Sequence, residues 1–190
     1  MRDEDFIRGN VPMTKSEVRA VSISKLELTE DAILYDVGAG TGSVSIEAGR
    51  YLKTGKIFAI EKKKEAIALL KANKDRFSAD HVVVVEGMAP EAFRKLPCPS
   101  HAFLGGTSGH MDEILDLLLE KNPFLRAVIN VIALESLGKT LESLKRRGIE
   151  PEIISLQVAK AKKAGPYHLM EGQNPIYILS FGGKPQEEKE

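Results

Sequence analysis

A glycine-rich turn directly after an apolar strand is the feature that most constrains this chain. Residues 33–42 read ILYDVGAGTG, in which an aliphatic run passes through Asp36 into glycines at alternate positions. Such glycines let the backbone turn sharply and approach a ligand without a Cβ clash. The helix expected to begin near Ser43 offers that ligand unpaired N–H groups and a partial positive charge. The segment therefore predicts a small-molecule site at the end of a strand.

Strand and helix patterns alternate from residue 33 onward, which is typical of βαβ units around a parallel sheet. Seven segments are expected to be strands: 33–37, 56–60, 82–86, 102–104, 127–133, 153–159 and 176–181. Apolar residues recur at helical spacing between them, for example over 65–77 and 111–122. We predict one doubly wound α/β domain over residues 1–184.

Two terminal segments fall outside this alternation. Residues 1–30 are expected to form a helical cover, in which Thr14 and Glu17 have the spacing of a capping box at the start of a helix. Residues 185–190, PQEEKE, are expected to be a disordered charged tail.

Composition narrows the classes of partner. Basic and acidic residues number 27 each, so the chain lacks the basic excess that nucleic-acid backbones usually demand. The single cysteine, Cys98, allows no intramolecular disulfide and no cysteine-rich metal site, which favours a reducing cytoplasm. The apolar runs are too short to span a bilayer, and the N-terminus lacks the apolar core of a signal peptide. We expect a cytoplasmic protein with no metal, nucleic-acid or membrane partner.

Two carboxylates favour S-adenosylmethionine (SAM) over a dinucleotide as the ligand. The glycine spacing is Gly-x-Gly-x-Gly, not the Gly-x-Gly-x-x-Gly of dinucleotide sites, and Asp36 would attract the ammonium of a methionine moiety and repel a pyrophosphate. Glu61 ends the second predicted strand about 20 residues later, where a carboxylate accepts ribose hydroxyls. The alternative is that Glu61 merely begins the solvated run 61–65.

The third predicted strand ends at the level of an adenine pocket. Met88 is a candidate to pack on the ring, and the N–H groups of Met88 and Ala89 are candidates to read its edge. The alternative for Met88 is a core side chain.

These features together resemble class I SAM-dependent methyltransferases, whose seven-stranded, mostly parallel Rossmann-like sheet has a reversed last strand. More specifically, the chain is similar to the decarboxylating cobalt-precorrin-6B C15-methyltransferases of cobalamin (vitamin B12) biosynthesis. The segments that carry this resemblance are PMTK (12–15), DVGAGTG (36–42), GMAPE (87–91), GG (105–106) and NP (174–175). Met88 and His101 depart from it, because the family often has an acid at both positions.

The resemblance implies methyl transfer from SAM to C15 of a cobalt-precorrin, with decarboxylation of the C12 acetate, to give cobalt-precorrin-8. It also implies a homotetramer. The residues that it implies in SAM binding are Thr14, Gly38, Ala39, Gly40, Thr41, Gly42, Glu61 and Ala89.

A corrinoid substrate with many carboxylates would need cations and N–H donors around the pocket. Lys15 and Arg19 of the N-terminal cover are candidates. The loop from Gly105 and Gly106 to His110 is a candidate carboxylate-binding nest, with a flexible connection as the alternative. The basic stretch 160–168 is interpreted as a solvated loop or a substrate lid. No catalytic residue is nominated, because the macrocycle itself can accept the electrons of decarboxylation.

Two other functions stay open at this point. A tRNA or protein methyltransferase would share the SAM site and differ in its acceptor. A non-catalytic SAM-binding subunit would bind the cofactor without transferring its methyl group.

Overall fold

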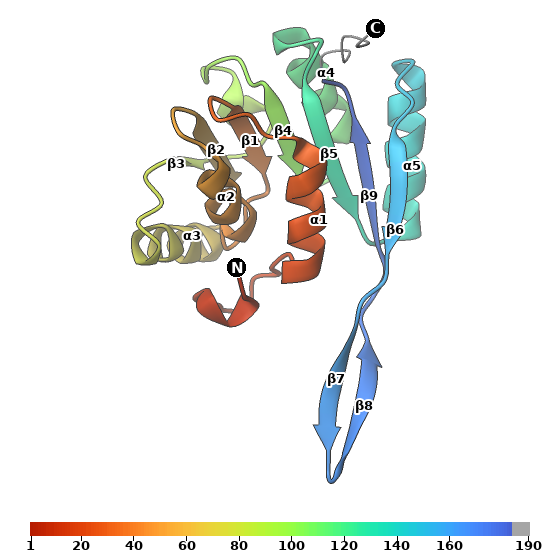
Figure 1. Cartoon of the computed structure of the whole chain (residues 1–190). Helices are drawn as coiled ribbons and strands as arrows, with labels where there is room; N and C mark the ends of the chain where they lie inside the picture. The colour runs from red at the N-terminus through yellow and green to blue at the C-terminus, as the bar shows by residue number, and fades with distance from the viewer. Residues whose placement is uncertain (184–190) are drawn as a thin grey trace, which may run out of the picture.

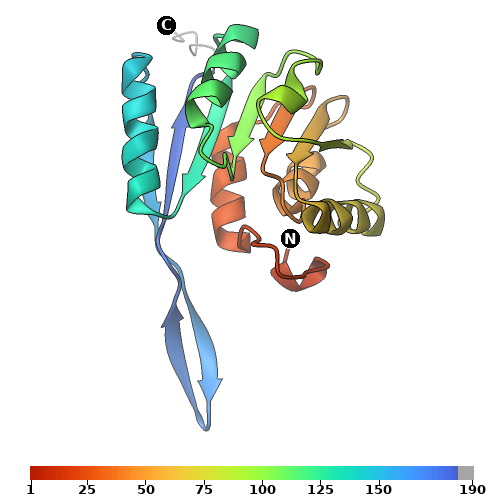
Figure 2. The same ribbon diagram turned by 180° about the vertical axis from the view of Figure 1, so that it is seen from behind.

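The computed structural model describes residues 1–183 and has one central sheet with helices on both faces (Figures 1 and 2). The strands of this sheet are β1 (Ile33–Val37), β2 (Lys56–Glu61), β3 (Val82–Glu86), β4 (His101–Leu104), β5 (Arg126–Val131), β6 (Glu152–Leu156) and β9 (Ile176–Phe181). The helices are α1 (Ser16–Leu26), α2 (Ser43–Ala48), α3 (Lys64–Arg76), α4 (Met111–Lys121) and α5 (Leu134–Arg146). Three short 3₁₀ turns lie at Asp3–Asp5, Gly49–Tyr51 and Glu91–Phe93.

The sheet order is β3-β2-β1-β4-β5-β9-β6. Strands β1 to β5 pair in parallel, whereas β9 runs antiparallel to both β5 and β6. The predicted doubly wound sheet with a reversed last strand is therefore confirmed. The order reverses between β1 and β4, and in open α/β sheets such a switch point opens a crevice at the carboxyl ends of the strands.

Burial on both faces explains why the central strands read as continuous apolar runs. Leu34 and Tyr35 of β1 point to opposite faces, and both are fully buried. On α4 the predicted apolar face is confirmed, because Ile114, Leu115 and Leu118 are all buried against the sheet.

The segment after β6 differs from the prediction. The strand expected over 153–159 ends at Leu156, and the next residues form a hairpin of β7 (Ala159–Ala164) and β8 (Tyr167–Gly172). Every residue of this hairpin is exposed, and it extends well beyond the sheet (Figure 1). The basic stretch is thus neither a loop nor a lid over this chain's own sheet.

The capping-box prediction at Thr14 is wrong. The N-cap of α1 is Lys15, and no side chain caps the helix. Thr14 instead accepts a hydrogen bond at its carbonyl oxygen from Arg19 Nη1, at 2.6 Å. Position 14 therefore lies one residue outside the helix, where the chain enters from the N-terminal cover.

Arg19 is not available to a substrate, which contradicts its prediction as a surface cation. Its side chain is fully buried and pairs with Glu47 of α2 at 2.5 Å and with Asp3 at 3.2 Å. These bonds fasten the N-terminal cover to α2, and Arg19 is a structural residue.

The predicted tail over 185–190 lies outside the described residues.

Among residues 1–183, no helix combines the length and the apolar character that crossing a bilayer requires.

We predict that Arg19→Met lowers the free energy of unfolding by about 3 kcal/mol, because it removes the cation that pairs with the buried Asp3 and with Glu47, although Glu47 keeps its pair with the N-terminal amine. Denaturant unfolding measures this change. Arg76→Met, at an exposed position of α3, is the control and should change stability little. An equally small effect of Arg19→Met would contradict the structural role.

Candidate functional site

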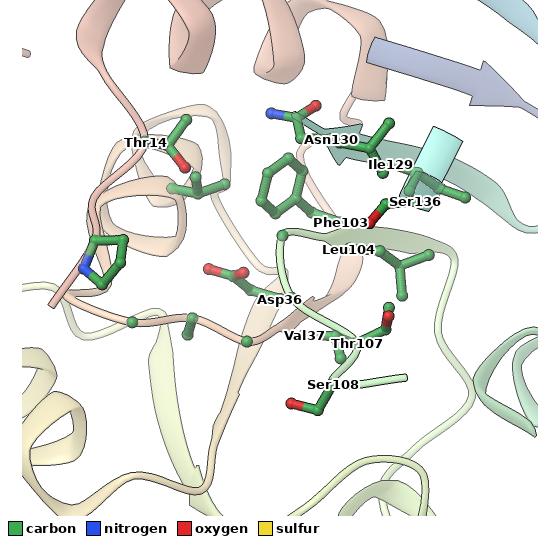
Figure 3. A pocket seen from close by; sticks show the side chains of 18 of the residues that line it. Thr14, Asp36, Val37, Phe103, Leu104, Thr107, Ser108, Ile129, Asn130 and Ser136 are labelled. Carbon is green, nitrogen blue, oxygen red and sulfur yellow. The ribbon is translucent and has the colours of Figure 1, made fainter. Parts of the chain in front are cut away.

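A pocket of about 1150 Å³ opens at the carboxyl ends of the parallel strands, at the switch point between β1 and β4 (Figure 3). Its first half is formed by the ends of β1, β2 and β3 and by residues 11–15 of the N-terminal cover. Its second half is formed by the loops after β4 and β5, by α5 and by the residues before β9. Single small-molecule sites usually measure about 300–1,000 Å³, so this pocket is larger than the usual site for one ligand.

The turn after β1 packs against the loop after β4 with no room for a side chain. A Cβ on Gly38 would lie 2.6 Å from the carbonyl oxygen of Gly106, and the φ of Gly38 is +76°, in the left-handed region. Glycine is therefore required here both by space and by backbone conformation. The contact brings the two halves of the pocket together.

The Glu61 carboxylate is held in a fixed position by backbone donors. Its Oε2 accepts the N–H of Gly40 at 2.9 Å, and its Oε1 accepts the N–H groups of Lys62 and Lys63 at 2.8 and 2.9 Å. The side chain is only 8% exposed. Since a carboxylate has about four acceptor positions, one position on Oε2 is left for a ligand.

Asp36 is a buried acid at the end of β1. Its Oδ2 accepts a hydrogen bond from Ser45 of α2 at 2.5 Å, whereas its buried Oδ1 has no partner among the described residues. Burial raises the pKa of Asp36 to about 6; the hydrogen bonds of Ser45 oppose this rise, and the charge of Glu61 adds to it. A buried acceptor without a donor is costly, so a cationic group bound in the pocket would be stabilised at this position.

Most of the predicted cofactor residues line the first half of the pocket, and Thr14 and Asp36 can be followed in Figure 3. These are Thr14, Asp36, Gly38, Ala39, Gly40, Thr41, Glu61, Met88 and Ala89. Gly42 is not among the lining residues. It is the N-cap of α2, and a Cβ there would lie 2.2 Å from Leu70 Cδ1, so its role is to let α2 pack on α3.

The two residues predicted for adenine differ in exposure. Met88 is 42% exposed, whereas Ala89 is 8% exposed. Met88 is therefore not a core side chain, and it contacts Lys62 Nζ through its sulfur at 4.0 Å.

The predicted substrate residues divide into two groups. Lys15, Gly105 and Gly106 line the pocket, whereas Arg19 and His110 do not. His110 is the N-cap of α4 and lies 3.7 Å from Glu113. The N–H groups of Gly105 and Gly106 both donate to the Val37 carbonyl.

The backbone N–H groups of this loop that remain free to bind a ligand are at its tip. No hydrogen bond within residues 1–183 uses the N–H of Thr107, Ser108 or Gly109. Ser108 and Gly109 have positive φ angles of 53° and 91°, which turn successive N–H groups in new directions. The candidate carboxylate nest therefore covers residues 107–109 and not the two glycines before it.

Several polar residues of the second half were not singled out from the sequence. Asn130 of β5 lines the pocket and donates from Nδ2 to Ser22 Oγ of α1 at 2.8 Å. Ser136 and Lys139 of α5 also line it. For Asn130, the position near the end of a predicted strand was the one sequence feature that could have indicated a pocket residue. For Ser136 and Lys139, no local sequence feature indicates it.

Within residues 1–183, no group of three or more histidine, cysteine, aspartate or glutamate side chains has the geometry of a metal site.

The strand order and this pocket are those of a class I SAM-dependent methyltransferase. The chain belongs to the precorrin methyltransferase domain family, whose model matches residues 5–181.

Similar proteins agree with this family. A relative from Sulfurisphaera tokodaii, named "Probable cobalt-precorrin-6B C(15)-methyltransferase (decarboxylating)", is 40% identical over 96% of both chains. The cobalt-precorrin-6B C(15)-methyltransferase (decarboxylating) of Salmonella typhimurium is 37% identical over 95% of this chain and 94% of its own. The crystal structure of precorrin-6y C5,15-methyltransferase from Geobacter metallireducens matches with a TM-score of 0.91 and 37% identity, over 96% of this chain and 97% of that one.

We predict that Asp36→Asn stabilises the ligand-free protein in a pH-dependent way. Because the pKa of Asp36 is raised from 3.8 to about 6 on folding, its contribution favours the folded state below about pH 3.8 and is lost as the pH rises through about 6. The free energy of unfolding of the variant should exceed that of the wild type by about 3 kcal/mol at about pH 8 and by little at about pH 4.

Denaturant unfolding at several pH values measures this difference. Asp80→Asn, at an exposed position, is the control and should show no such gain. A difference between Asp36→Asn and wild type that is constant with pH would contradict a buried charge at Asp36.

Proposed function

We propose that this chain transfers a methyl group from SAM to C15 of cobalt-precorrin-6B and decarboxylates its C12 acetate, giving cobalt-precorrin-8. The observation that carries the proposal is that one large pocket has the buried carboxylates of Asp36 and Glu61 in its first half and an apolar floor with the free N–H groups of residues 107–109 in its second. The relatives named above as cobalt-precorrin-6B C(15)-methyltransferases support the choice of substrate.

The residues of the first half fit SAM. The unpartnered Oδ1 of Asp36 suits the ammonium of the methionine moiety, directly or through a water. The remaining acceptor position on Glu61 Oε2 suits one ribose hydroxyl; accepting the second would require Glu61 to release one backbone N–H. Thr14 lines this half from the N-terminal cover, and Met88 and Ala89 line the part that we assign to adenine.

SAM, when bound, supplies an electrophilic methyl group on its sulfonium. The task of the protein is then to align the carbon nucleophile with that methyl and to exclude water. The close contact of Gly38 with Gly106 keeps the two ligands adjacent.

The second half suits a macrocycle with acidic side chains. Phe103, Leu104 and Ile129 give it an apolar floor, and all three are buried. The free N–H groups of residues 107–109 lie at its edge and can bind a carboxylate.

Loss of carbon dioxide breaks the bond between the acetate CH₂ and its carboxyl carbon, and the electron pair moves into the conjugated macrocycle. A cation paired with that carboxylate would oppose its departure. We therefore assign the C12 acetate to the apolar floor and the other carboxylates to the edge.

The test is to incubate the protein with methyl-labelled SAM and cobalt-precorrin-6B without oxygen and to follow the macrocycle by mass spectrometry. We expect the gain of one methyl group and the loss of one carboxyl as carbon dioxide. Glu61→Ala should reduce the rate by raising the Kd for SAM, whereas Glu120→Ala, on the surface of α4, is the matched control. SAM binding without any change in the macrocycle would contradict the proposal.

A homotetramer assembled through the hairpin β7–β8 is the second part of the proposal. Tyr167, Leu169 and Met170 are 70%, 60% and 67% exposed in a single chain. An isolated two-stranded ribbon is only marginally stable, so packing against other copies would account for both its length and its apolar side chains.

We predict that Leu169→Glu combined with Met170→Glu reduces the assembly to smaller species in analytical ultracentrifugation, because it places charges in the subunit contact. Phe124→Glu is the control, since Phe124 is 64% exposed but lies outside the hairpin. A hairpin variant with the sedimentation of the wild type would contradict assembly through β7–β8.

A further inference from the structure

We propose that Lys139 of α5 and Lys15 of the N-terminal cover are the residues that anchor the substrate's peripheral carboxylates from opposite sides of the pocket. The inference rests on the proposed function and names residues that determine which macrocycles the pocket accepts. It arises from a comparison of the basic side chains that line the pocket: Lys15, Lys62, Lys63, Lys139 and Arg146.

Arg146 is already neutralised. It makes a two-bond contact with Asp112, both bonds at 2.7 Å, and a further one with Glu142 at 3.1 Å. Asp112 also accepts hydrogen bonds from Ser143 and Arg147, and these contacts hold its pKa well below its usual range. Arg146 therefore belongs to a network that ties α5 to α4, and a substrate would have to compete with two acids for it.

Lys62 and Lys63 belong to the cofactor half. They directly follow Glu61, and their backbone N–H groups hold its carboxylate. The side chain of Lys62 lies against Met88, on the side of β2 and β3. They follow β2, and β1 lies between β2 and β4, whose loop begins the second half.

Lys139 and Lys15 differ from Arg146 because neither is paired with an acid within residues 1–183, and they differ from Lys62 and Lys63 because they lie away from the end of β2. Neither makes an ion pair with any acid in the described part of the chain. Lys139 lies three residues after Ser136 on α5, so both side chains lie on the same side of the helix, and both line the pocket. Lys15 lines it from the N-terminal cover, next to Thr14, which Figure 3 places across the pocket from Ser136.

This arrangement suits a rigid, flat polyanion. A lysine on each side can bind carboxylates at separate edges of one macrocycle, while the leaving acetate lies over the apolar floor of Phe103 and Leu104. Cations at the edge then contribute to binding in the ground state and the transition state equally. Their loss should raise KM for the macrocycle and leave kcat unchanged.

The test uses uroporphyrin I as a stable polycarboxylate probe, with its binding followed by fluorescence in the presence of S-adenosylhomocysteine. We expect Lys139→Gln and Lys15→Gln each to raise its Kd roughly three- to tenfold, as for partly exposed charge pairs, with a smaller effect at high salt. Lys139→Arg should stay near wild type. The matched control is Lys145→Gln, because Lys145 is exposed on the same helix but does not line the pocket.

The same variants are then measured in methyl transfer to cobalt-precorrin-6B. We expect a higher KM for the macrocycle, with kcat and the KM for SAM unchanged. Wild-type protein that does not bind uroporphyrin I, lysine variants that bind it as tightly as wild type, or an equal loss in Lys145→Gln would each overturn the anchoring role.

The two proposals fail in different ways. Lysine-dependent binding of uroporphyrin I without methylation of the corrinoid would overturn the proposed reaction and support the anchors. Normal kinetics of Lys139→Gln and Lys15→Gln in an enzyme that methylates the corrinoid would support the proposed reaction and overturn the anchoring role of the two lysines.

Discussion

The contact between Gly38 and Gly106 is the constraint on which the site depends. A methyl group at position 38 would meet the carbonyl oxygen of Gly106 at 2.6 Å, so the turn after β1 and the loop after β4 pack backbone to backbone. The N–H groups of Gly105 and Gly106 reinforce this contact by donating to Val37. Because β1 and β4 flank the switch point of the sheet, the contact joins the cofactor half and the substrate half into one pocket.

Two buried acids make the ligand-free pocket electrostatically unfavourable in a way that suits its proposed ligand. Asp36 has an unpartnered oxygen and a raised pKa, and the nearby Glu61 is already held by three backbone N–H groups. A cationic ligand group would relieve this unfavourable charge, whereas a pyrophosphate would increase it. Stability and cofactor binding therefore place opposite demands on the same carboxylate.

The features that could be predicted from the sequence are set by neighbouring residues. The features that could not be predicted depend on partners that are distant in the sequence. The turn after β1 was predictable because its glycine spacing encodes its own conformation. Arg19 was misassigned because its partners Asp3 and Glu47 come from separate segments. Strand β7 was missed because the sequence AKAKKA lacks β-branched residues and is paired only through β8. Lys139 became a candidate only when the ion pairs of Arg146 were known.

The most direct measurement is a crystal structure of the protein with S-adenosylhomocysteine and cobalt-precorrin-8 bound together. We predict a ribose hydroxyl on Glu61, the amino acid moiety beside Asp36, and the macrocycle between residues 107–109 and α5, with C15 facing the sulfur. A macrocycle bound outside the second half of the pocket, or an adenosyl group that does not contact Glu61, would contradict this prediction.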